Sequence, residues 1–417
     1  MAAGTVHIVG AGLAGLSAAV RLVQAGRTVV VHELARFAGG RCRSLYEPVL
    51  DLTIDNGNHL LLSANHAALS FLKILGTQHL LAGPDEAEFP FADLTTGKRW
   101  TVRPNSGRIG WWIFSERRRV PGTRPLEYLA LAKLLTARAD QTIADVIDTN
   151  SALYRKLLHP VLISALNTDP KEASAKLAGA IVRETLAQGG SATRSLVAPE
   201  GLGPVFVDPA VEWLQNNGAA VRFDHAVRKI EFNATSVTGL EFADDKMTLG
   251  PTDAIILTVP GWVARTLVPD LKTPSEYRAI VNAHYKIAPP KGTPALQGVL
   301  GGTTEWLFAF ADRLSVTVSA ADRLINAERE PLAREIWGEV VKLTGLPAEM
   351  PPWQIIKERR ATFAATPSEN AKRPGTQTKW RNLLLAGDWT QTGLPSTIEG
   401  SIRSGVTAAT MAGTLAP

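Results

Sequence analysis

Residues 6–33 read VHIVGAGLAGLSAAVRLVQAGRTVVVHE, and this stretch predicts a nucleotide-binding unit of the α/β class. A short apolar strand is expected over 7–9. A helix rich in small residues follows over 13–25, and a second buried strand covers 28–32. A strand, a glycine-rich turn, a helix and a second strand in this order are the start of a Rossmann-like fold.

The turn between the first strand and the helix carries the pattern Gly10-x-Gly12-x-x-Gly15. The first glycine permits a tight turn, the second lets the backbone approach a pyrophosphate, and the third lets helix and strand pack closely. The phosphates would bind the exposed amides at the helix N-terminus, around Leu13 and Ala14, where the helix dipole favours negative charge. The alternative for such a pattern alone is a structural glycine turn.

Glu33 ends the second strand, where a carboxylate can accept a hydrogen bond from a ribose hydroxyl. The same charge disfavours a 2′-phosphate, so NADP is not expected here. A second glycine turn, Gly39-Gly40-Arg41, suits a phosphate or ribose edge, with Arg41 pairing with the pyrophosphate. The alternative is a surface loop with solvated arginines. Cys42, the next residue, is interpreted as a packed small side chain rather than a covalent flavin anchor.

The C-terminal segment repeats this pattern. An apolar strand over 383–386 runs into Gly387 and Asp388, and a helix rich in small residues is expected over 396–411. Asp388 can hold a ribityl or ribose hydroxyl, and the helix N-terminus can face the carbonyl edge of a reduced flavin ring. The alternative is an ordinary strand–helix unit.

The composition of the chain indicates a globular protein with a large core. It has 417 residues, 45% of them hydrophobic and 20% charged, and a net charge of +5. This mildly basic balance fits an anionic ligand or an anionic membrane, and no nucleic-acid-reading motif is present. With one cysteine, neither an intramolecular disulfide nor a cysteine-based metal site is possible, and no metal is expected. The start of the sequence lacks a signal peptide's basic region, and no long apolar run spans a bilayer, so a cytoplasmic location is expected.

Residues 109–135 have the composition of a segment that enters one face of a membrane. The aromatic run at 111–114 is followed by the basic cluster 117–119 and by a Leu-rich helix that begins at Pro125. Aromatic residues beside a basic cluster and an apolar helix favour an interfacial position. The alternative is a core helix with a solvated loop.

At this point the chain resembles a known family. The motifs GAGLAGLSAA (10–19), AGGR (38–41), DNG (55–57), LAGDW (385–389) and GLPSTIEGSIRSG (393–405) follow the order of the FAD-dependent amine oxidase and phytoene desaturase superfamily. Within it, the chain is most similar to the squalene-associated FAD-dependent desaturases, which are hydroxysqualene dehydroxylases of bacterial hopanoid synthesis. The stretches IDNGNHLLLSA, HPVLISALNTDPKEASA and KERRATFAATP carry this finer resemblance. In that group the residue after DNG is commonly Gln, whereas here it is Asn58.

The resemblance implies a Rossmann-like FAD-binding domain with three layers, two of β-sheet and one of helices (ββα). It would be built from residues 1–76, 196–265 and 372–417. An α+β substrate domain, residues 77–195 and 266–371, would be inserted into it. The residues implied at the adenosine pyrophosphate are Gly10, Gly12, Leu13, Ala14, Gly15 and Glu33, with Gly40 and Arg41 beside it and Val227 at the adenine. Those implied at the pyrophosphate and ribityl chain are Gly387 and Asp388. Those implied at the flavin ring are Ile398 and Glu399 near it and Asn56, Gly57, Asn58 and His59 at its active face.

In the implied reaction, reduced flavin delivers a hydride to hydroxysqualene, water leaves, and squalene is formed. Hydroxide is a poor leaving group, so an acid is expected beside it. The predicted catalytic residues are His59, Asn58 and Asn167, with His59 as the acid; Asp55 and His284 are further candidates. Alternatively, an apolar tunnel could stabilise an allylic cation without a strong acid.

Two other functions are consistent with the same motifs. One is a carotenoid or phytoene-type desaturase, and the other is a non-catalytic isoprenoid escort of the same fold. A hydrocarbon substrate would enter from a lipid phase, so we expect peripheral association with the inner face of the cytoplasmic membrane. No second nucleotide motif identifies the electron donor.

Overall fold

The computed structural model describes residues 4–414. Its first unit is the predicted one, in which β1 (Val6–Val9), α1 (Leu13–Gln24) and β2 (Val29–His32) follow one another. These strands belong to a five-stranded sheet of order β19-β13-β1-β2-β9, in which all neighbours are parallel. The other three strands are β9 (Ala220–Arg222), β13 (Ala254–Leu257) and β19 (Leu383–Leu385).

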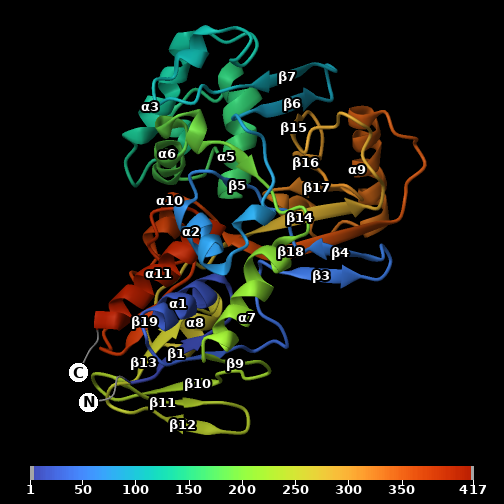
Figure 1. Ribbon diagram of the computed structural model, residues 1–417. Coiled ribbons are helices and arrows are strands. Elements are labelled where there is room, and N and C mark those ends of the chain that lie inside the picture. The colour runs from blue at the N-terminus through green and yellow to red at the C-terminus, as the bar shows by residue number, and fades with distance from the viewer. Residues whose placement is uncertain (1–3, 415–417) are drawn as a thin grey trace.

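Two different layers cover this sheet (Figure 1). Helices α1, α2, α7 and α11 pack on one face, and a three-stranded antiparallel sheet packs near the other, together with α8. The elements are α2 (His66–Leu75), α7 (Asp208–Asn216), α8 (Gly261–Leu267), α11 (Ile398–Thr414), β10 (Lys229–Phe232), β11 (Val237–Glu241) and β12 (Lys246–Thr248). The predicted three-layer ββα fold is therefore confirmed.

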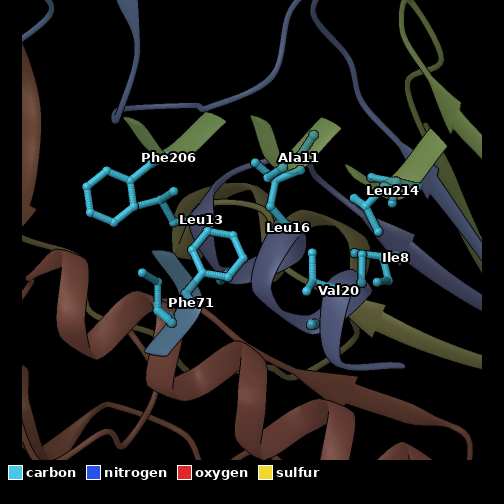
Figure 2. Packing of buried hydrophobic residues seen from close by; sticks show 14 of the residues in the cluster. Ile8, Ala11, Leu13, Leu16, Val20, Phe71, Phe206 and Leu214 are labelled. Carbon is cyan, nitrogen blue, oxygen red and sulfur yellow. The ribbon is translucent and has the colours of Figure 1, made fainter. Parts of the chain in front are cut away.

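Helix α1 lies at the centre of the largest apolar cluster. Figure 2 shows side chains of α1, among them Leu16 and Val20, gathered with Phe71, Phe206 and Leu214 from three other segments. Strand β1 contributes Ile8 to the same cluster. Since alternate residues of a strand point to opposite faces, β1 and β13 each supply both apolar layers.

The second large sheet has seven strands in the order β18-β14-β17-β16-β15-β6-β7. Its strands are β6 (Phe89–Asp93), β7 (Arg99–Val102), β14 (Tyr277–Tyr285), β15 (Leu296–Leu300), β16 (Trp306–Ala309), β17 (Leu314–Val318) and β18 (Trp353–Phe363). Strands β6 and β7 form an antiparallel hairpin. Helix α9 (Arg329–Thr344) covers one face of the sheet.

The sequence analysis did not identify β14 and β18, the two longest strands of this sheet. Strand β18 reads WQIIKERRATF, and β14 carries Asn282 and His284 inside a buried run. These polar residues interrupt the apolar pattern from which a strand is recognised. The two strands form because they pair antiparallel with each other over most of their length.

A helical lobe lies against the face of the seven-stranded sheet opposite α9 (Figure 1). It contains α3 (Leu129–Leu135), α4 (Ile143–Val146), α5 (His159–Leu166) and α6 (Ala175–Glu184). Helix α3 begins later than predicted, because Pro125–Tyr128 form a 3₁₀ turn. A π-helical turn, Tyr154–Leu158, precedes Pro160, and another, Gly203–Val207, precedes Pro209. Proline cannot donate to the carbonyl four residues earlier, so the helix adopts a wider turn before each one.

Smaller elements connect these parts. They are β3 (Ser44–Glu47), β4 (Leu52–Asp55), β5 (Leu61–Leu62), β8 (Ser195–Leu196), α10 (Pro367–Ala371) and the 3₁₀ turns η1 (Gln78–Leu80), η2 (Trp111–Phe114), η3 (Pro125–Tyr128), η5 (Leu186–Gln188), η6 (Gly190–Ala192) and η8 (Ala321–Leu324).

The packing of α1 gives a first prediction. Leu16 is fully buried, so Leu16→Ala should lower the free energy of unfolding by about 2–5 kcal/mol through lost burial and a residual cavity. Leu126, which is 77% exposed, is the matched control. Leu126→Ala should change the free energy of unfolding by less than about 0.5 kcal/mol. Urea unfolding of both variants measures the difference, and equal destabilisation would contradict the central position of α1.

Candidate functional site

The glycine turn between β1 and α1 has the geometry of an anion cradle. Gly10 has φ +109°, and a Cβ on Gly15 would lie 2.0 Å from the Gly10 carbonyl oxygen, so both positions require glycine. A Cβ on Gly12, by contrast, would have no heavy atom within 4 Å among the described residues. Helix α1 has neither a side-chain cap nor an acidic residue in its first turn, which leaves the amides of Leu13 and Ala14 free for a phosphate.

Glu33 and the second glycine turn both lie against this cradle. The Glu33 carboxylate accepts the Ala11 amide at 2.7 Å and the Ala35 amide at 2.9 Å. The Gly39 amide donates to the Ala11 carbonyl at 2.8 Å, and Gly12 and Gly39 form a parallel bridge. The exposed Gly40 follows. The three features expected at the adenosine pyrophosphate are therefore brought together, with the Glu33 carboxylate held in one orientation.

Arg41 and Asp388 contact each other. Arg41 donates to Asp388 Oδ1 at 2.6 Å and to the Ala361 carbonyl of β18 at 2.6 Å. Burial alone would raise the pKa of Asp388, but the Arg41 guanidinium holds it below its usual value, so the carboxylate is charged. A pyrophosphate bound here could accept hydrogen bonds from Arg41, and a ribityl hydroxyl could donate one to Asp388, in place of some contacts between these two residues. Arg373, which the sequence analysis missed, donates to the Asp388 carbonyl.

The loop Asn56–His59 is seated on β18, β14 and β17, the three strands at one side of the seven-stranded sheet. Asn56 Nδ2 donates to Glu358 of β18 at 3.3 Å, and Asn58 Nδ2 donates to Thr317 of β17 at 3.1 Å. Thr317 in turn donates to Asn282 of β14 at 2.8 Å. The sequence analysis missed Asn282, Thr317 and Glu358. Their signal is weak, because Asn282 and Thr317 alternate with apolar residues in their strands and Glu358 stands in the charged run KERR.

His59 does not have the protonation state expected of it. Burial, aided by the nearby Arg41 charge, lowers the pKa of His59 to about 4. The imidazole is therefore neutral at neutral pH and can donate a hydrogen bond. His59 stays a predicted catalytic residue, and its low pKa favours a hydrogen-bond donor over a charged acid.

The side chain of Asn167, a predicted catalytic residue, is hydrogen-bonded to other parts of the chain. It ends α5 in the left-handed conformation, with φ 47°. Its Nδ2 donates to Thr362 Oγ1 at 2.9 Å, and its Oδ1 accepts the Ala320 amide at 2.6 Å. These bonds tie the helical lobe to the sheet and occupy the side-chain amide. The structure therefore favours a positioning role for Asn167.

The two further acid candidates also have local partners. Asp55 Oδ1 accepts Ser44 Oγ at 2.6 Å and the Leu202 amide at 2.8 Å, which joins β4 to the loop before α7. His284 Nδ1 and Ser315 Oγ form a hydrogen bond of 2.8 Å, and burial lowers the pKa of His284 to about 3. The His284 imidazole is therefore neutral, and the Asp55 carboxyl is hydrogen-bonded to two neighbouring segments of the chain.

The remaining predicted ligands lie on other elements around the five-stranded sheet. Val227 precedes β10 and is partly buried. Ile398 begins α11 and packs against the α1 cluster. Glu399 accepts the Ala67 and Ala68 amides at 3.0 and 2.9 Å, so it caps α2 instead of facing a flavin ring.

Cys42 is buried, and burial raises the pKa of its thiol well above the usual range. This environment fits the interpretation of Cys42 as a packed side chain, because a thiolate is the reactive form.

The helical lobe carries a cluster of exposed apolar side chains, which we call the apolar patch. It consists of Ile109, Trp111, Phe114, Leu126 and Leu129, which are 50–83% exposed. Arg118 lies over the Trp111 ring at 5.0 Å. Trp112, expected among the aromatic residues at a membrane, is instead buried against Tyr128. Within residues 4–414, no helix has the length and apolar character needed to cross a bilayer.

Comparison with known proteins places the chain in a family. Residues 13–412 match the model of the flavin-containing amine oxidoreductases. Two proteins named hydroxysqualene dehydroxylase are similar over nearly their whole length. The one from Rhodopseudomonas palustris is 55% identical over 97% of each chain, and the one from Sinorhizobium fredii is 54% identical over 98% of each. A solved structure of putrescine oxidase shares the fold, with a TM-score of 0.71, 17% identity and 98% coverage of both chains.

The ion pair at the cradle gives a second prediction. Arg41→Ala should weaken FAD binding by roughly ten- to a hundredfold, since a hydrogen bond to a charged group contributes about 1.5–3 kcal/mol. Flavin absorbance after dialysis and titration of the apoprotein measure the change. Arg36→Ala is the control, because Arg36 is exposed and pairs only with the exposed Asp224. Unchanged affinity of the Arg41 variant would contradict its position at the pyrophosphate.

Proposed function

This chain belongs to the flavin-containing amine oxidoreductases and, within them, to the hydroxysqualene dehydroxylase family, and on this premise we propose that it converts hydroxysqualene to squalene with FAD. The observation that carries the proposal is the 54–55% identity to proteins of that name over 97–98% of their length. The same proteins weigh against a carotenoid desaturase, the alternative with the same cofactor.

The residues at and around the glycine cradle fit FAD. The open space beside Gly12, the uncapped amides of α1 and the fixed Glu33 carboxylate suit an adenosine pyrophosphate. Arg41, Gly387 and Asp388 suit the pyrophosphate and ribityl chain, Val227 the adenine, and Asn56, Gly57 and Ile398 the neighbourhood of the ring. Bound FAD in its reduced form supplies a hydride. The intact ligand set argues against a non-catalytic escort.

The chain's own residues bind and orient the isoprenoid. Trp306, Phe308 and Phe310 are buried on the face of the sheet that meets the helical lobe, and they belong to one apolar cluster with it. This wall suits a hydrocarbon chain and excludes water from the reacting carbon. Asn58 and the neutral His59, at the edge of that face, can donate hydrogen bonds to the substrate hydroxyl.

The domain boundaries are part of the proposal. We assign residues 1–76, 196–265 and 372–417 to the FAD-binding domain, and 77–195 and 266–371 to the substrate domain. In support, every strand of the five-stranded sheet falls in the first set, and every strand of the seven-stranded sheet falls in the second.

The activity can be tested directly. Holoenzyme reduced chemically under anaerobic conditions is mixed with hydroxysqualene, and the products and flavin absorbance are followed. We expect squalene and oxidised flavin in equal amounts. The absence of squalene would contradict the proposal, and new double bonds in an added carotenoid precursor would favour the desaturase.

We also propose that the apolar patch docks on an anionic membrane surface at the inner face of the cytoplasmic membrane. Five large apolar side chains are exposed together on one lobe, beside arginines at 117–119. This combination is typical of interfacial docking, in which apolar insertion and attraction to anionic lipids act together. A hydrocarbon substrate could pass from the bilayer to the lobe without entering water.

The docking prediction concerns liposome binding. The double variant Phe114→Ser/Leu126→Ser should lose most sedimentation with vesicles containing anionic lipid, because it removes two of the most exposed apolar side chains. Tyr46→Ser/Val49→Ser is the matched control, since these residues are 61% and 66% exposed outside the helical lobe. Equal binding of both variants and wild type would refute the docking surface.

A further inference from the structure

One row of side chains crosses the seven-stranded sheet on the face that meets the helical lobe. Trp306 of β16 pairs directly with Thr317 of β17, and Thr317 pairs directly with Asn282 of β14. Directly opposed residues of neighbouring strands point to the same face and lie about 5 Å apart. Thr317 Oγ1 accepts Asn58 Nδ2 at 3.1 Å and donates to Asn282 Oδ1 at 2.8 Å. The Asn58 amide therefore lies in the immediate neighbourhood of Trp306.

Trp306 also belongs to the apolar wall that it forms with Phe308 and Phe310. On the side of β6 it lies beside Phe91, with ring centroids 5.9 Å apart. The Phe91 ring covers Gly298 of β15, because a Cβ on this glycine would lie 2.4 Å from the ring. On the side of β17 the row is polar and begins with Thr317. Trp306 is therefore the residue at which the apolar wall ends and the polar row begins.

The indole N–H of Trp306 has no hydrogen-bond partner. Trp306 is 5% exposed, and its Nε1 is buried without a partner within residues 4–414. Thr304 Oγ1 of the preceding loop and the Tyr154 hydroxyl of the helical lobe are buried polar groups of the same kind. Buried polar groups are nearly always paired, so an unpaired donor indicates a ligand or a water molecule that completes it. An alcohol oxygen suits this position, because an indole N–H can only donate.

We infer that the Trp306 indole N–H donates a hydrogen bond to the hydroxyl oxygen of hydroxysqualene and so selects this alcohol over squalene, an inference that rests on the proposed function. A hydroxyl oxygen has two lone pairs, so it can accept from Trp306 and from the Asn58 amide together. Squalene has no oxygen and leaves the indole N–H unpaired, which costs the desolvation of a buried donor. A site that pairs with a hydroxyl therefore discriminates against the analogue that lacks it. For the same reason the product is held less firmly than the substrate.

The test measures binding without turnover. Oxidised holoenzyme, which has no hydride to transfer, is immobilised and equilibrated with detergent micelles that contain equal amounts of hydroxysqualene and squalene. The lipids that stay bound are quantified by mass spectrometry, and we expect wild type to retain the alcohol in excess. Trp306→Phe keeps an aromatic ring in the wall and removes the N–H, so this excess should fall roughly five- to a hundredfold, the cost of leaving a buried donor unpaired. Its flavin absorbance should match that of wild type.

Trp337→Phe is the matched control. Trp337 of α9 is buried on the opposite face of the sheet, where its Nε1 donates to the Ala348 carbonyl at 3.1 Å. This variant loses an indole N–H away from the proposed contact and should keep the wild-type preference for the alcohol.

A second measurement uses wild type alone. With isotopic labels at the indole nitrogens of its ten tryptophans, one indole proton resonance should move downfield with hydroxysqualene and should not do so with squalene. The inference is overturned if Trp306→Phe keeps the wild-type preference, or if no indole proton responds to the alcohol alone. A wild type that forms squalene but shows no preference for the alcohol also overturns the inference and leaves the proposed function intact. If reduced wild type forms no squalene, the proposed function fails and the inference falls with it.

Discussion

Two parallel strands need a crossover connection between them, because the chain must return to the same end of the sheet before it pairs again. In this protein β1 and β2 come from one local unit, whereas β9, β13 and β19 arrive from positions more than 180 residues later. The chain between them therefore forms the helical lobe and the seven-stranded sheet. The hydrogen bonds of the five-stranded sheet set the positions of all these insertions (Figure 1).

This constraint brings charges from distant parts of the chain to one crevice. Asp388 follows β19 and meets Arg41, which follows the second glycine turn, and Arg41 also reaches the backbone of β18. The two ends of the chain and the inserted sheet thus meet at a single guanidinium. Asp388 is buried while the Arg41 side chain is 36% exposed, so solvent screens this pair only in part.

The carboxyls of the molecule differ because their surroundings differ. Asp388 has Arg41 beside it and stays charged, whereas burial raises the pKa of Glu305 although the Ser319 hydrogen bonds and the Arg323 charge lower it. A carboxyl group can therefore be an anion at one place in the fold and a weak acid at another. The same sheet adds an apolar wall from Trp306 to Phe310, where water is excluded and a hydrocarbon can lie.

The sequence by itself determined the nucleotide unit at 6–33, the C-terminal strand and helix, and the family. These features are recognisable because turn chemistry, helix periodicity and short apolar strands are local properties of the chain. Only the tertiary structure decided that Trp112 is buried, that Glu399 caps α2, that burial lowers the pKa of His59 and that Asn167 bonds to Thr362 of β18. It also revealed strands β14 and β18 and the pairing of Asn282 with Thr317. Burial, strand pairing and acid strength depend on residues far apart in the chain, and a single sequence does not state which of them meet.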